Sequence, residues 1–239
     1  MSITETNRLA LPLLQPAQAQ KHVTVNEALM RIDGLTNLVL QSISVGVPPA
    51  DPEDGECWGV PGGATGAWSG QIGRIAIASN GGWVFVRITR GMQAFVLDRG
   101  VRAIHTGTAW SLGAASLGML GSSMLEGMEE AEIMVSAGET VATGVVIPAG
   151  AMVIGAVARV VTAIGGSLSS WKLGTDGAED RFGSGLGTST GSWARGMLGQ
   201  PMTYYQPAEL LMTASAGTFS GSGKVRLAVH WLELRLPSA

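Results

Sequence analysis

Residues 224–234, KVRLAVHWLEL, carry the clearest structural signal in the sequence. Large apolar side chains alternate there with polar or smaller ones: Val225, Leu227, Val229 and Trp231 against Arg226, Ala228, His230 and Leu232. A period of two places the first group on one face of an extended chain and the second group on the other face. The stretch therefore predicts a sandwich strand with one buried face.

Working outward from this strand, we expect residues 131–239 to form one antiparallel β-sandwich. The expected strands are short apolar runs bounded by turn residues. They are 132–135, 139–147, 152–161, 169–174, 202–205, 209–215 and 224–234. The Gly- and Ser-rich stretch 187–196, GTSTGSWARG, is expected to form a long exposed loop between two of them.

A second β pattern fills residues 46–112. Its short apolar runs are 56–60, 73–78, 83–88, 94–97 and 101–105. The turns between them are rich in Gly, as in Asn80-Gly81-Gly82 and Asp98-Arg99-Gly100, and Gly tolerates the positive φ that such turns require. The pattern predicts a small β-meander module.

Residues 1–45 contain the one convincing helical pattern of the sequence, with Asn26 as its expected N-cap. Apolar residues then recur at steps of three and four: Ala28, Leu29, Ile32, Leu35, Leu38 and Val39. An extended apolar arm, punctuated by prolines, precedes this helix. An arm and one helix cannot form a core alone, so we expect both to dock on something.

Residues 113–130 change to Ala, Ser, Leu and Met. Leu117, Leu120, Met124 and Met128 have helical spacing, although the intervening glycines weaken an isolated helix. Two interpretations remain: a linker with a turn or two of helix, or a trimeric stem whose Met side chains fill a seam between chains. The predicted fold class is mainly β, with an N-terminal arm and short helix, a small β-meander and a C-terminal antiparallel β-sandwich.

The composition excludes several classes of protein. Of the 239 residues, 46% are hydrophobic and 14% charged, and the net charge of −3 is small, so intrinsic disorder is excluded. Nucleic-acid binding needs clustered Lys and Arg, but the lysines lie far apart at positions 21, 172 and 224 and the arginines are scattered. We therefore expect no nucleic acid as a partner.

The sequence also argues against a membrane or export role. Pro12, Gln15 and Pro16 interrupt the apolar run near the N-terminus, so no signal peptide is expected. The most apolar stretch, 145–164, contains Pro148 and Arg159 and is not expected to insert into a membrane. We expect a protein made in the cytoplasm.

Signatures of catalysis are missing. There is no Gly-x-Ser-x-Gly elbow and no His-Glu-x-x-His motif. The histidines, His22, His105 and His230, lie in three separate segments, and Cys57 is expected to be a small buried strand residue. The Gly-rich stretch 182–187 leads into no helix, which excludes a dinucleotide loop. We expect no enzyme activity, metal or cofactor.

One loop-rich region holds carboxylates beside aromatic residues. Its members are Trp171, Asp176, Glu179, Asp180, Arg181 and Trp193. Three interpretations stay open: a glycosidase with Glu179 or Asp180 as the acid, a non-catalytic sugar contact, or a structural role with Trp171 in a core strand and Asp176–Gly177 as a turn.

Several motifs near the N-terminus are too specific to be general structural patterns. They are Leu11-Pro12-Leu13-Leu14, Gln18-Ala19-Gln20-Lys21-His22-Val23-Thr24, Asn26-Glu27-Ala28-Leu29, Gly66-Ala67-Trp68-Ser69-Gly70-Gln71, Gly81-Gly82-Trp83-Val84-Phe85, Gly91-Met92-Gln93-Ala94-Phe95-Val96 and Gly107-Thr108-Ala109-Trp110. With them, residues 9–112 resemble a family of proteins of formerly unknown function from alphaproteobacterial phages, prophages and gene transfer agents. Residues 145–227 resemble the carboxyl-terminal sandwich of its tail-fibre members.

The resemblance implies a structural tail fibre of a phage-like particle and a homotrimer, with no catalytic residues to carry over. Residues 1–45 would attach to tail or baseplate proteins, and residues 131–239 would contact a host surface polysaccharide. The chain is short for a fibre, so it would be a compact tip or an accessory fibre of the virion. Two alternatives are kept: a capsule-degrading glycoside hydrolase, and a trimerising cap without receptor contact.

Candidate contact residues follow from these expectations. Those for attachment to the particle are Gln18, Gln20, Lys21, His22, Asn26 and Glu27. Those for the glycan are Trp171, Asp176, Asp180, Arg181, Trp193, Tyr204 and Tyr205.

Overall fold

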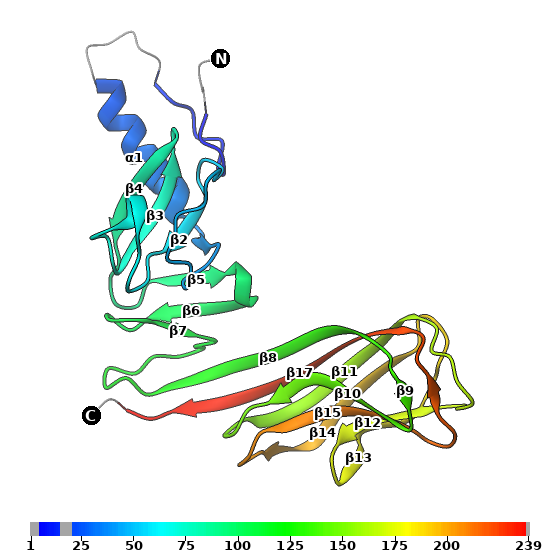
Figure 1. The fold of residues 1–239 in the computed structure, drawn as a ribbon. Coiled ribbons are helices and arrows are strands. Elements are labelled where there is room, and N and C mark those ends of the chain that lie inside the picture. Colours follow the sequence, from blue (N-terminus) through cyan, green and yellow to red (C-terminus); the bar gives the residue numbers. More distant parts are fainter. Residues whose placement is uncertain (1–4, 15–20, 238–239) are drawn as a thin grey trace. The chain divides into compact units, whose positions relative to one another are not determined.

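A computed structural model describes residues 5–14 and 21–237, and the chain divides into two compact units. The first unit is Met1–Ser123 with Leu236–Ala239, and the second is Met124–Arg235. Helix α1 (Lys21–Leu35) belongs to the first unit (Figure 1). In the part of the chain that the structure describes, no helix is long and apolar enough to cross a membrane.

The first unit is built on one seven-stranded sheet in the order β4-β3-β2-β1-β5-β6-β7. Its strands are β1 (Val39–Leu40), β2 (Cys57–Gly59), β3 (Arg74–Ser79), β4 (Gly82–Arg87), β5 (Gln93–Val96), β6 (Val101–His105) and β7 (Trp110–Leu112). Two short 3-10 helices, Gly66–Trp68 and Leu97–Arg99, lie in the connections. The five strands predicted between residues 56 and 105 are confirmed, and the arm, helix and meander share this one unit.

Strand β3 shows why the sheet has two apolar faces. Ile75 and Ile77 belong to a core with Leu40 and Cys57, whereas Ala76 and Ala78 belong to a second core with a tryptophan cluster. Helix α1 lies on the isoleucine side, where a Cβ atom on Gly34 would be 2.7 Å from the Ile77 Cδ1 atom. Gly34 therefore permits the close approach of helix and sheet, which offsets its low helix propensity.

The N-terminal arm is held at the end of α1 through Asp33, which is fully buried. The Asp33 carboxylate accepts hydrogen bonds from the Thr6 hydroxyl at 2.8 Å and from the backbone N–H groups of Arg8 and Leu9 at 3.1 and 2.6 Å. In return, the Arg8 guanidinium donates to the backbone carbonyls of Asp33, Gly34, Thr36 and Asn37. Arg8 thus satisfies carbonyls that the helix end leaves without intrahelical donors.

We expect Asp33→Ala to destabilise the first unit by about 3 kcal/mol, because three donors from the arm, one of them buried and two partly buried, lose their acceptor. Glu27→Ala is the matched control on the same helix; it removes an exposed pair with Arg31 and should cost less than about 0.5 kcal/mol. Chemical denaturation of both variants measures the difference. Equal stabilities would show that the arm does not depend on Asp33.

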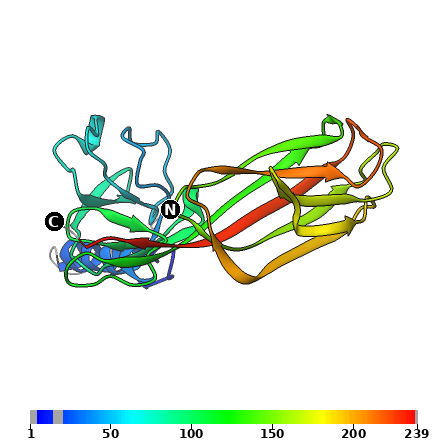
Figure 2. The same ribbon diagram turned by 90° about the horizontal axis from the view of Figure 1, so that it is seen from below.

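The second unit is a sandwich of two four-stranded sheets, in the orders β14-β11-β17-β8 and β10-β15-β12-β13. Its strands are β8 (Ser123–Met134), β9 (Ala137–Gly138), β10 (Thr140–Ile147), β11 (Met152–Thr162), β12 (Trp171–Thr175), β13 (Ala178–Leu186), β14 (Trp193–Thr203), β15 (Ala208–Ala214), β16 (Phe219–Ser220) and β17 (Lys224–Arg235). This order of eight main strands is that of a jelly roll. Strand β17, red in Figure 2, runs along the length of the unit.

The core of this unit comes from the inward positions of both sheets. Its largest fully buried side chains are Trp171, Phe182, Phe219, Ile147, Leu173, Leu210 and Met212. In β17 the predicted alternation is confirmed for Val225, Leu227 and Val229, which are buried, whereas Trp231 is only partly buried. Their outward neighbours Arg226, Ala228 and His230 are left on the opposite face of the sheet.

Three local predictions are wrong. The helix begins at Lys21, so Asn26 lies inside it rather than at its N-cap. Residues 123–130 are part of strand β8, so the spacing of Met124 and Met128 does not mark a helix; Ser123 and Leu125 are buried there, whereas Met124 and Glu126 are exposed. The trimeric stem stays a prediction. The stretch 187–196 contains the start of β14 instead of one long loop.

Candidate functional site

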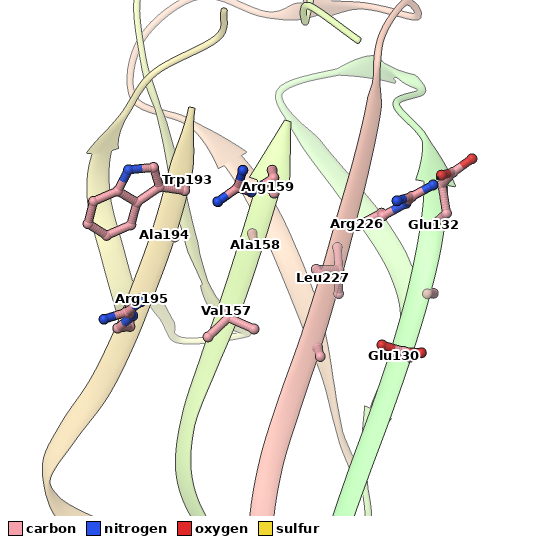
Figure 3. A pocket seen from close by; sticks show the side chains of 12 residues that line it. Glu130, Glu132, Val157, Ala158, Arg159, Trp193, Ala194, Arg195, Arg226 and Leu227 are labelled. Carbon is pink, nitrogen blue, oxygen red and sulfur yellow. Dashed lines mark hydrogen bonds and ion pairs between the residues drawn. The ribbon is translucent and has the colours of Figure 1, made fainter. Parts of the chain in front are cut away.

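A groove of about 820 Å³ lies on the outer face of the sheet β14-β11-β17-β8, entirely within the second unit (Figure 3). Its floor contains the short side chains of Val157 in β11 and Ala228 in β17. Longer side chains of the edge strands β14 and β8 border this floor. The hollow thus lies over Val157 and Ala228, while Arg159 and Arg226 of the same two central strands also line the groove.

The strand register arranges the groove in two cross-strand rows. In the first row Arg159 of β11 lies opposite Trp193 of β14 on one side and opposite Arg226 of β17 on the other. In the second row Val157 lies between Arg195 and Ala228. Adjacent strands are about 4.8 Å apart, so side chains of one row are direct neighbours.

Carboxylates of β8 close the far side of the groove, next to Arg226 (Figure 3). The Glu132 carboxylate accepts from the Arg226 Nε atom at 2.8 Å and from the Lys224 Nζ atom at 3.0 Å. These hydrogen bonds hold the pKa of Glu132 below its usual value. Arg226 is therefore part of an ion-pair cluster, and Glu132 stays ionised.

The other two arginines of the groove have no carboxylate partner among the described residues. Arg195 lies over the Trp193 ring, with 5.9 Å between the guanidinium carbon and the ring centroid, and Arg159 makes no ion pair there. Trp193 itself is 62% exposed. The groove therefore offers an exposed aromatic face and, among the described residues, two cations without an acidic partner, and both kinds of group can bind a ligand.

Of the residues predicted to contact a glycan, only Trp193 lines this groove. The prediction that Trp171 contacts a glycan is wrong. Trp171 is 1% exposed in the sandwich core, and its indole N–H donates to the Gly187 carbonyl oxygen. Its place in a core strand follows from the inward face of β12. A ligand at the surface cannot contact it.

The remaining predicted glycan contacts lie elsewhere in the second unit. Asp176 is exposed in the tight turn between β12 and β13, and Asp180 is exposed in β13. The Arg181 Nη1 atom donates to the Met202 Sδ atom, and Tyr204 packs against the core. Tyr205 is 82% exposed. None of these residues lines the groove.

The residues proposed as a glycosidase acid are exposed strand residues. Glu179 pairs with Lys172 at 3.4 Å, with both side chains partly open to solvent. No group of three or more His, Cys, Asp or Glu side chains that could hold a metal ion occurs among the described residues.

The buried titratable side chains of the first unit are engaged with its own backbone. The Cys57 thiol faces the carbonyl oxygens of Gly34 and Gly55, and burial raises its pKa to about 12. The His105 Nδ1 atom accepts the Gly107 N–H, and burial lowers the pKa of this imidazole. Both groups are uncharged near neutral pH and serve the packing of the sheet.

The predicted attachment residues are described only in part. Gln18 and Gln20 lie outside the described residues, as do the side chains of Lys21 and His22 at the start of α1. The Asn26 side chain pairs with the backbone of Leu14 through both its oxygen and its nitrogen, and Glu27 pairs with Arg31. Asn26 therefore fastens the arm of its own chain.

Sequence reasoning missed most of the groove because its residues come from four strands that are far apart in the sequence. A signal was present for Arg159 and Arg226, which occupy outward positions in strands that the alternation predicts. Arg195 and Glu130 gave no such signal, because 187–196 was expected to be a loop and the strand expected at 132–135 begins after Glu130. Glu132 is the first residue of that expected strand, but nothing in the sequence showed which strand lies beside it.

Comparison with known proteins concerns the first unit. Residues 25–111 match a family model described as a protein of unknown function, DUF2793. The match runs from within α1 to β7. It covers the tryptophan-bearing meander that carries the resemblance seen in the sequence. No curated protein matches the chain.

Proposed function

We propose that this chain is a structural fibre subunit of a phage or gene-transfer-agent particle, which binds a host cell-surface glycan through its second unit. The observation that carries the proposal is the groove on the β14-β11-β17-β8 sheet, with exposed Trp193 beside Arg159 and Arg195. Shallow grooves with an exposed aromatic face suit the apolar face of a sugar ring, and jelly rolls recur among lectin and viral coat domains.

The first unit supports the structural part of the proposal. Its match to the DUF2793 family model and its resemblance to phage and gene-transfer-agent proteins favour a particle component. In this role the subunit is a homotrimer in the virion, with the N-terminal region attached to tail or baseplate proteins. Gln18, Gln20, Lys21, His22 and Glu27 remain candidate contacts for that attachment.

Binding of particles to host cells tests the proposal. We expect Trp193→Ala to weaken adsorption and the affinity of the purified protein for host surface polysaccharide by about tenfold, as for loss of an aromatic anchor. Val146→Ala is the control, because Val146 is an exposed apolar residue on β10 of the other sheet. Unchanged adsorption of the Trp193→Ala particles would overturn the proposed role of the groove.

The same preparations test the other parts of the proposal. Mass photometry should give a trimer, and immunolabelling should place the protein on the particle. The polysaccharide should show no new reducing ends after incubation with the protein. A stable monomer that never joins particles would contradict the fibre, and new reducing ends would indicate a hydrolase instead.

A further inference from the structure

We infer that the groove selects an acidic sugar, whose carboxylate is held between Arg159 and Arg195 while its ring lies on Trp193. This inference rests on the proposed function and names the ligand class for the same site. It starts from the charge arrangement of the groove and does not depend on which organism supplies the glycan.

The first row of the groove places two arginines directly opposite each other, Arg159 in β11 and Arg226 in β17. Like charges in directly opposed positions destabilise a sheet, so such a pair calls for compensation. Glu132 compensates Arg226 and Lys224. Within the described chain, Arg159 receives no such partner. An anionic ligand would supply the partner that Arg159 lacks among the described residues.

The second uncompensated cation is placed to act on the same ligand. Arg195 belongs to the neighbouring row and is diagonal to Arg159 across the β11–β14 pair. A guanidinium is a planar fork that matches a carboxylate with two parallel hydrogen bonds. Figure 3 shows Trp193 and Arg195 on the same edge strand, with Arg159 on the adjacent strand. A carboxylate near both arginines would leave the attached sugar ring within reach of the Trp193 face.

The opposite border of the groove has the reverse charge. Glu130 and Glu132 of β8 line it, and Glu132 is kept ionised by its basic partners. Carboxylates accept hydrogen bonds from hydroxyl groups, which every sugar ring carries. The groove is thus cationic on the β11–β14 side and a hydroxyl acceptor on the β8 side.

This polarity favours an acidic sugar over a nucleic acid. A nucleic-acid backbone presents phosphates along its whole length and is bound by a run of Lys and Arg. In this groove a second phosphate would meet Glu130 and Glu132, and the chain as a whole has a net charge of −3. One anionic group beside several hydroxyl groups fits both borders.

The test uses the full chain and three polysaccharide probes: polygalacturonate, alginate and hyaluronan. Each probe is compared with its carboxyl-reduced form, in which every carboxylate has become an alcohol. We expect at least one acidic form to bind about tenfold or more tightly than its reduced form by calorimetry, and this preference should shrink as salt is added.

Variants then test whether Arg159 and Arg195 cause the preference for the acidic form. Arg159→Gln and Arg195→Gln should each lower the affinity for the acidic form about tenfold and leave the affinity for the reduced form nearly unchanged. Lys172→Gln removes one positive charge from β12 of the other sheet and should change neither affinity. Arg159→Gln should not lower the melting temperature, because it removes an opposed like charge.

The possible outcomes separate the inference from the proposed function. Equal binding of every acidic form and its reduced form overturns the acidic-sugar inference and leaves glycan binding intact. Tighter binding of dextran sulfate or of an oligonucleotide than of any carboxylated probe also overturns the inference. Failure to bind these probes and the host polysaccharide alike overturns both. A loss of melting temperature in Arg159→Gln would assign Arg159 to structure.

Discussion

Replacing Trp68 by alanine should be the most damaging single substitution in the first unit, with a loss of about 3–5 kcal/mol in the free energy of unfolding. Trp68 is fully buried between Trp58 and Trp83, at ring-centroid distances of 6.0 and 5.1 Å. Removing it leaves a cavity and breaks two tilted or edge-to-face ring contacts at once. The loss can be measured by denaturant titration followed by tryptophan fluorescence.

Two further variants test whether the loss of stability in Trp68→Ala comes from the buried ring. Trp68→Phe should cost much less, because it keeps an aromatic ring and removes an indole N–H that is buried without a hydrogen-bond partner in the described chain. Trp193→Ala deletes an exposed ring and should cost about 1 kcal/mol or less. If Trp68→Ala were as mild as Trp193→Ala, the tryptophan cluster would not be the core of that face.

Gly196→Ala should disrupt the second unit, with an expected cost of about 3 kcal/mol. A Cβ atom at Gly196 would overlap the carbonyl oxygen of Phe182, so β14 and β13 could not keep their close approach where the two sheets meet. A backbone atom cannot move aside as a flexible side chain can. Thermal unfolding followed by circular dichroism would detect the loss.

Gly199→Ala provides a control in the same strand, because nothing lies within 4 Å of the position that its Cβ would occupy. Alanine should be tolerated there or should be slightly stabilising, since it reduces the freedom of the unfolded chain. Similar melting temperatures for the two variants would contradict the close approach of β13 and β14.

The sequence predicted those parts of the fold that carry a clear alternation or a clear turn. Strand β17 shows the alternation, with Val225, Leu227 and Val229 buried, and the hairpin of β3 and β4 shows the turn at Asn80-Gly81. Strands β13 and β14 were missed almost entirely. In the sequence their glycines are typical of loops. In the structure Gly196 lies where the backbones of β14 and β13 meet, and a side chain would not fit there.

The candidate site was harder to predict than the fold. Trp193 was found because an exposed aromatic residue in a polar stretch is unusual, although it lies in a strand and not in a loop. Arg159 and Arg195 become neighbours only through the register of β11 and β14, which no local pattern specifies. Asp33 was missed because an acidic residue in an amphipathic helix is normally expected to face water.

The two-residue strand β1 has a consequence for the order in which the first unit folds. It pairs in parallel with β2 on one side and with β5 on the other, and so joins two groups of strands that are otherwise separate. Each group consists of hairpins that close over short distances in the chain, whereas the pairing of Val39 with Phe95 closes a long loop. Long-range closure is slow, so the hairpins should form first and β1 should join them in a later, rate-limiting step.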